Sequence, residues 1–98
     1  MNQHAILRAR MLLLSSGDLS RAQRLRAFRT LAPASPAVYR PKLARLLMKI
    51  SAEPALRTRP EARRDLLTEA LTTIEALDPA DPQRPALLAD VLTALRDC

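Results

Sequence analysis

Apolar residues recur along this chain with the three- and four-residue spacing of a helix that is buried on one side. The clearest example places four of them at positions i, i+3, i+4 and i+7: Leu43, Leu46, Leu47 and Ile50. At 100° per residue, three cations fall on the opposite side of that helix, within about 60° of one another: Lys42, Arg45 and Lys49. The pattern predicts an amphipathic helix with a basic outer side.

Three other segments carry the same kind of apolar stripe. Their stripes are Leu25, Phe28, Leu31 and Ala32; Leu67, Ala70, Leu71 and Ile74; and Leu88, Val91, Leu92 and Leu95. No segment alternates apolar and polar residues as a half-buried strand does. With a further helix expected from about Gln3 to Ser15, the sequence predicts about five helices.

Proline and glycine mark the ends of these helices. The chain has one glycine, Gly17, and eight prolines, all between positions 33 and 85. Helices are expected to begin near Gln3, Ser20, Pro41, Pro60, and either Pro82 or Pro85, with an irregular segment from Glu53 to Arg59. Asn2 and Gly17 are expected to cap the first helix. Ser20 with Gln23, and Thr58 with Glu61, have the spacing of a capping box, which is expected at the start of their helices.

The 98 residues suit one domain, and each amphipathic helix must bury its apolar stripe against a neighbour. The predicted fold class is therefore all-α. The helices form either an antiparallel helical-hairpin bundle or a short repeat stack, in a single helical domain spanning residues 1–98.

Charge divides that domain into two unequal parts. Residues 1–64 hold 14 of the 16 Lys and Arg and three acids, a net +11, whereas residues 65–98 hold two Arg and seven acids, a net −5. This asymmetry predicts a basic surface that faces an acidic partner, or two halves that attract each other within or between chains. Because 14 of the cations are Arg in an Ala- and Leu-rich chain, a G+C-rich genome also explains their number, though not their placement.

Three fragments resemble tetratricopeptide repeats, the helical-hairpin arrays that bind peptides. Residues 17–22 (GDLSRA) are similar to the turn between the two helices of such a repeat. Residues 69–75 are similar to its second helix, and residues 77–79 (LDP) to its end. Residues 39–44 (YRPKLA) return loosely as 83–88 (QRPALL), 44 positions later. The resemblance implies a non-enzymatic module whose first helix in each hairpin lines a groove, here including Lys42, Arg45 and Lys49 as carboxylate contacts.

The sequence also departs from that family. Arg10 stands where the repeat has a small residue, Arg26 stands where it prefers an aromatic one, and the period is longer than the standard repeat. An unrelated helical bundle is the alternative.

Few residues suggest chemistry. His4 has no Cys, Asp or Glu near it in sequence, and Cys98 is the only cysteine, so no metal or cofactor site and no disulfide are expected. Glu61, Asp65 and Glu69 share one helix side, where a solvated acidic stripe is the simpler interpretation than a catalytic pair. One glycine excludes a glycine-rich phosphate loop. Because none of these residues forms a catalytic pattern, no enzyme is expected.

Arg21 and Arg24 lie in the first turn of their helix, where its dipole disfavours cations. Together with Lys42, Arg45 and Lys49 they are the candidate binding residues. The predicted function is a protein- or peptide-binding adaptor with an acidic partner or a second copy as its ligand. The alternative is a small nucleic-acid accessory protein that contacts the phosphate backbone.

The cellular setting is expected to be the cytoplasm, because the only cysteine is unpaired and the longest apolar run, residues 11–14, is too short to cross a membrane. A helix-turn-helix DNA reader is excluded by Leu13 and Gln23, which do not fit the positions around its turn glycine. An Arg-rich mitochondrial presequence is a further alternative, which the predicted caps argue against.

Overall fold

A computed structural model of the chain describes residues 3–14 and 20–98. Within these residues it is all-helical, as predicted, and contains no strand. The helices are α1 (Gln3–Leu14), α2 (Arg21–Leu31), α3 (Pro36–Ser51), the short 3₁₀ helix η1 (Pro54–Leu56), α4 (Pro60–Glu75) and α5 (Arg84–Arg96). The expected caps Asn2 and Gly17, and Ser15 at the end of the first helix, lie outside the described residues.

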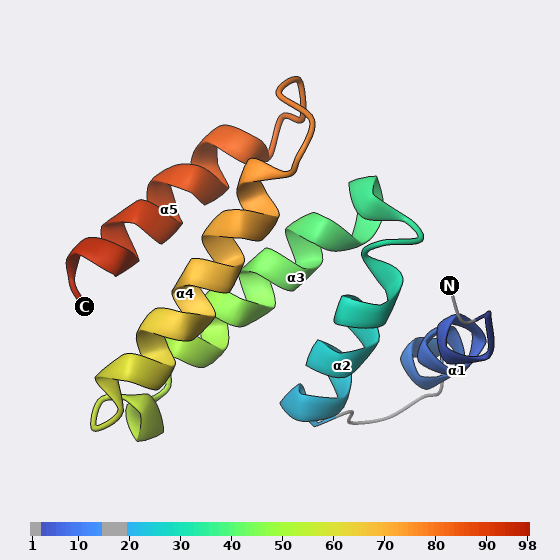
Figure 1. The fold of residues 1–98 in the computed structure, drawn as a ribbon, viewed down its shortest axis with the longest axis horizontal. Helices are drawn as coiled ribbons and strands as arrows, with labels where there is room; N and C mark the ends of the chain where they lie inside the picture. Colours follow the sequence, from blue (N-terminus) through green and yellow to red (C-terminus); the bar gives the residue numbers. More distant parts are fainter. Residues whose placement is uncertain (1–2, 15–19) are drawn as a thin grey trace.

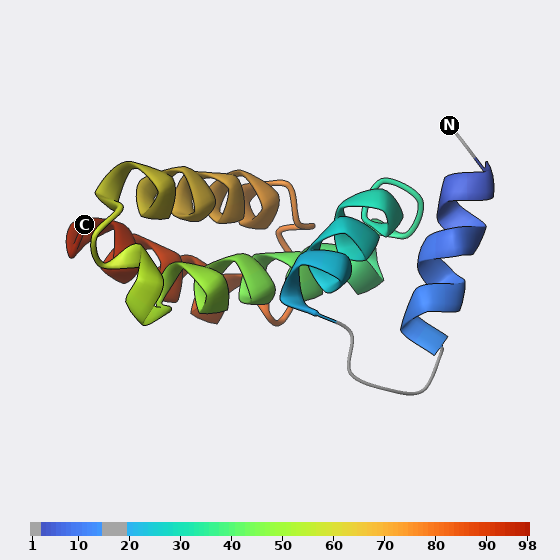
Figure 2. The ribbon, with the colours of Figure 1, turned by 90° about the horizontal axis from the view of Figure 1, so that it is seen from below.

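The helices form two layers, with α4 lying over α3 and α5 (Figures 1 and 2). The shortest dimension of the molecule is 23 Å, which corresponds to two helix diameters of about 10 Å each. Helix α2 packs against α3 on the edge opposite to α5 (Figure 1). Helix α1 packs against α2 at the far end of the molecule. One side of α3 is therefore covered by α4, while its other side stays open between its neighbours.

The main core lies between α3, α4 and α5 and is almost entirely aliphatic. Its fully buried members include Leu47, Leu67, Ile74 and Val91. The predicted stripes of α3 and α4 are thus confirmed in their central residues. The stripe of α5 is partly wrong: Leu87 is buried, whereas Leu92 is 45% exposed.

A second, smaller core attaches α1. Ala9 of α1 packs with Ala27 and Leu31 of α2, and the half-buried Ile6 and Tyr39 pack around them. Leu31 is fully buried at this junction. The small side chains of the alanines at positions 9 and 27 let the two helix backbones approach closely.

Helix α3 begins five residues earlier than the sequence predicts. Pro36, not Pro41, occupies the first turn, and the Ser35 carbonyl accepts hydrogen bonds from the amides of Val38 and Tyr39. Pro41 therefore lies inside the helix, where its missing N–H leaves the Ala37 carbonyl without its helical donor. Pro41 itself is fully buried, so packing of its ring offsets part of the cost, which is about 3 kcal/mol in an exposed helix.

Only one of the two predicted capping boxes forms. The Gln23 amide donates to the Ser20 hydroxyl at 3.1 Å, and the Ser20 amide donates to the Gln23 side chain at 3.0 Å. The prediction for Thr58 and Glu61 is wrong, because the cap of α4 is Arg59 and the Thr58 hydroxyl donates instead to the Ala55 carbonyl. The turn of η1 places Thr58 one residue too early to cap α4.

This difference gives a matched pair of variants. Ser20→Ala is expected to lower the free energy of unfolding by about 1 kcal/mol, because α2 loses a cap that pairs one of its free amides. Thr58→Ala removes the same kind of side chain at a position without a capping role, and is expected to change stability by less than about 0.5 kcal/mol. Urea denaturation of both variants makes the comparison; equal losses would contradict the assignment of the caps.

Candidate functional site: a basic groove between α2 and α3

Four of the five candidate binding residues surround one hollow on the open side of α3. Lys42, Arg45 and Lys49 are all exposed on α3, and half-buried Arg24 faces them from the neighbouring α2. The hollow has a volume of about 480 Å³, and we call it the basic groove. Its lining consists of Arg24, Phe28, Lys42, Arg45, Leu46 and Lys49.

The basic groove has an apolar floor. Leu46 of α3 is only 5% exposed, and Phe28 of α2 is half-buried beside it. The Phe28 ring packs at a tilt against Tyr39, with 6.1 Å between ring centroids. Sequence reasoning assigned Phe28 and Leu46 to the core stripes alone. Only the crossing of α2 over α3 shows that both also form a surface under the cations.

Two of the cations are held in place by neutral partners. The Lys42 Nζ lies 5.5 Å from the centroid of the Tyr39 ring, a cation–π contact, and the Arg45 guanidinium donates to the side-chain oxygen of Gln83. Within the described residues, none of the four groove cations forms an ion pair, and no acid lines the groove. Their positive charge is therefore concentrated in one place, and no carboxylate of the described residues neutralises it.

The fifth candidate, Arg21, does not belong to the groove. Its guanidinium pairs with the Glu53 carboxylate, which follows the end of α3. The unfavourable position of Arg21 in the first turn of α2 is thus offset by an acid from elsewhere in the chain. Arg24, one turn further along, has no such acid beside it within the described part.

A different arginine joins the basic and acidic halves of the sequence. Arg29 of α2 holds both carboxylate oxygens of Glu69 on α4, with Nε–Oε2 at 2.9 Å and Nη2–Oε1 at 2.5 Å. The hydrogen bond to Glu69 raises the pKa of Arg29; burial opposes this rise, and the charge of Glu69 adds a smaller one. Part of the charge asymmetry is therefore used inside the molecule, where α2 meets α4.

This ion pair is expected to contribute little to stability. Both side chains are more than a third exposed, at 47% and 36%, so solvent screens their attraction. Glu69→Gln is expected to lower the free energy of unfolding by less than about 1 kcal/mol, measured by urea denaturation. A loss of several kcal/mol would contradict this assignment of the ion pair as a weak, solvent-screened contact between α2 and α4.

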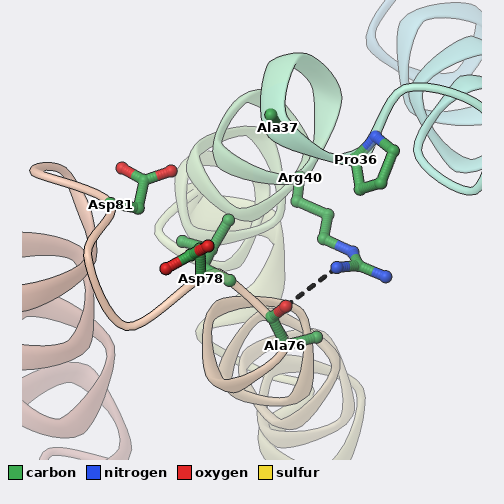
Figure 3. A pocket seen from close by; sticks show the side chains of 7 residues that line it. Pro36, Ala37, Arg40, Ala76, Asp78 and Asp81 are labelled. Carbon is green, nitrogen blue, oxygen red and sulfur yellow. Dashed lines mark hydrogen bonds between the residues drawn. The ribbon is translucent and has the colours of Figure 1, made fainter.

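A second hollow, of about 330 Å³, lies where the first turn of α3 meets the loop between α4 and α5. Figure 3 shows Arg40 reaching across it to the Ala76 carbonyl at the end of α4, a hydrogen bond of 2.8 Å. The Asp78 and Asp81 carboxylates point away from that guanidinium (Figure 3) and accept from the backbone amides of Ala80 and Gln83, each at 2.8 Å. The two aspartates therefore stabilise the turns of the loop between α4 and α5.

The predicted acidic stripe on α4 offers no paired carboxylates. Glu61 and Asp65 are exposed, and Glu69 is engaged by Arg29. Among residues 3–14 and 20–98, no three His, Cys, Asp or Glu side chains gather as metal ligands would. Nor is any helix of the described chain long and apolar enough to cross a membrane. Cys98 is exposed.

No family model, no curated protein and no solved structure matches this chain.

Proposed function

We propose that this protein is a non-enzymatic interaction module that binds an acidic segment of another protein in the basic groove. The observation that carries the proposal is the set of four cations that line one hollow without an acid among them. Two arginines outside the groove pair with carboxylates of the chain, Arg21 with Glu53 and Arg29 with Glu69. The cations of the groove remain for a partner.

Carboxylates from a partner would relieve the mutual repulsion of these cations. At the effective dielectric near a protein surface, two like charges some 8 Å apart repel by about 2 kcal/mol before screening by salt. Acidic residues of a partner, placed beside these cations, add attractions that offset the repulsion between them. Clustered surface charge of this kind speeds association and selects partners by charge, which suits an adaptor.

The resemblance to tetratricopeptide repeats is part of this proposal. It is supported by α3 packing against both α4 and α5, so that the second hairpin meets the helix that follows it. It is also supported by the position of Lys42, Arg45 and Lys49 on the first helix of that hairpin. The cytoplasm is the compartment we propose, on the grounds of the single unpaired cysteine.

An acidic peptide tests the proposal directly. The alanine probe is a helical peptide of about 14 residues built from glutamate and alanine, about 21 Å long and so longer than the groove cations extend along α3. We expect it to bind the full chain at about 50 mM salt and more weakly at about 200 mM, measured by fluorescence anisotropy. A lysine–alanine peptide of equal length is the control. Equal binding of both peptides would contradict a charge-selective site.

A nucleic acid is the second candidate partner, and one arrangement favours it. Arg57 and Arg59 in the connection before α4, and Arg64 in its first turns, are exposed at the end of α3 that carries Lys49. These residues extend the basic surface beyond the groove, toward the several phosphate contacts that a duplex requires.

Binding to random-sequence DNA and RNA separates the two candidates. An acidic-peptide module is expected to bind either nucleic acid only weakly at about 50 mM salt, and to lose that binding at about 200 mM. Micromolar or tighter binding that is weakened by Arg57→Glu and Arg59→Glu would instead favour the phosphate-backbone function.

A further inference from the structure

A purely ionic site needs no apolar floor, yet the basic groove has one, formed by the partly exposed Phe28 with Leu46 beneath it. Leu46 and Phe28 lie beneath a rim of long cationic side chains, and the hollow above them is large enough for a bulky aliphatic side chain. Salt bridges on a surface gain little, whereas each methylene group moved from water to an apolar surface contributes more reliably. The floor therefore offers affinity that the cations alone do not supply.

The open side of α3 continues the same alternation of charge and apolar surface. Val38 is 51% exposed and stands one turn before Lys42 on the side that carries the cations. Val38, Lys42, Arg45 and Lys49 follow positions i, i+4, i+7 and i+11, and so form one straight line about 16 Å long. A ligand that lies along this line contacts Val38 at one end and the three cations along its length. The apolar floor of the basic groove lies beside it.

We infer that the groove takes an amphipathic acidic helix, with one bulky aliphatic side chain seated over Phe28 and Leu46 and glutamates or aspartates directed at Lys42, Arg45 and Lys49. This inference rests on the proposed function and adds the form of the partner. A straight helical line of contacts suits a helix, which presents its own residues at the same three- and four-residue spacing.

Other occupants fit the groove less well. An extended peptide added to a sheet edge needs an open strand, and the described chain has none. A nucleic-acid backbone supplies phosphates for the cations but no aliphatic group for the floor. Its bases stack on exposed aromatic faces, whereas Phe28 and Tyr39 are both half-buried against each other.

Two peptides that differ in one side chain test the inference. The leucine probe is the alanine probe with one central alanine replaced by leucine. We expect the leucine probe to bind the full chain about tenfold more tightly, about 1.4 kcal/mol, as the added carbons leave water. Equal affinities would overturn the anchored helix while leaving the proposed function standing. Failure of both probes to bind at about 50 mM salt would overturn the proposed function with it.

Two variants separate the floor from the rim. Phe28→Leu, a modest change at a half-buried site, is expected to shrink the difference between the probes and to leave the alanine probe unaffected. Lys49→Gln is expected to weaken both probes by the same factor and so keep their ratio. A Phe28→Leu variant that weakens both probes equally, with an unchanged melting temperature, would contradict a role of the floor in seating the leucine.

A second copy of this chain is the remaining occupant, since α4 carries the exposed acids Glu61 and Asp65. Sedimentation of the chain alone, and then with the leucine probe, decides this. A monomer at probe concentrations supports the inference. Dimers that dissociate when the leucine probe is added would assign the groove to a second copy and overturn it.

Discussion

Reversing the charge of Lys42 and Lys49 together is expected to weaken binding of the leucine probe by about 30-fold or more. Each substitution to glutamate removes an attraction and adds a repulsion to the probe's carboxylates, and about 1 kcal/mol per residue gives a change of this size. Both side chains are exposed, so neither change disturbs the core. Fluorescence anisotropy at about 50 mM salt measures the effect.

The matched control changes the same amount of charge elsewhere. Arg57→Glu with Arg59→Glu lowers the net charge of the chain by the same four units, at two exposed positions outside the groove. We expect this control to weaken the leucine probe less than about threefold, because these residues do not line the groove and salt screens charges that are not in contact with the probe. Equal losses in the two double variants would show that net charge alone, and no particular groove, attracts the peptide.

Leu47→Ala is expected to lower the free energy of unfolding by about 2–5 kcal/mol. Leu47 is fully buried where α3 packs against α4, so its truncation leaves a cavity lined by aliphatic side chains that cannot rearrange to fill it. Domains have a total stability of about 5–15 kcal/mol, so this loss is a large fraction of the total and is expected to lower the melting temperature clearly.

Leu7→Ala is the control for that change. It removes the same atoms from α1 at a position that is 57% exposed, so we expect a loss below about 1 kcal/mol. Urea denaturation followed by circular dichroism compares the two. A Leu47→Ala loss as small as that of Leu7→Ala would contradict the packing of α3 against α4.

The helices were predictable because their apolar stripes are regular and their breaks are marked by proline. The stripe of α4 predicted that Leu67 and Ile74 would be buried, and both are fully buried. The start of α3 was not predictable from its local sequence, because an interior proline is tolerated only where its ring is packed, as at Pro41. That packing depends on tertiary structure, which the sequence pattern does not contain.

The grouping of charges was predictable only in part. Helical spacing alone placed Lys42, Arg45 and Lys49 on one side of α3, and the structure leaves that side open. Whether Arg21 or Arg24 would face them depended on how α2 crosses α3 and on Glu53, which is 32 residues away from Arg21 in the sequence. Local pattern identifies the side of a helix, and only the fold identifies its neighbour.

The same limit applies to the two charged halves. The net +11 and −5 predicted an attraction between them, and one contact of this kind forms, at Arg29 with Glu69. The four groove cations, of the 14 in residues 1–64, form no ion pair within the described residues. These unpaired positive charges are the ones that we propose interact with a partner.

The central claim is that the groove between α2 and α3 binds an acidic segment, and mapping where the leucine probe binds tests it most directly. Titrating the isotope-labelled chain with the probe, and following its amide resonances, locates the contact residue by residue. We predict that the largest shifts fall on Arg24, Phe28, Lys42, Arg45, Leu46 and Lys49. Shifts confined to Arg57, Arg59 and Arg64, or spread evenly over all the basic residues, would contradict the claim.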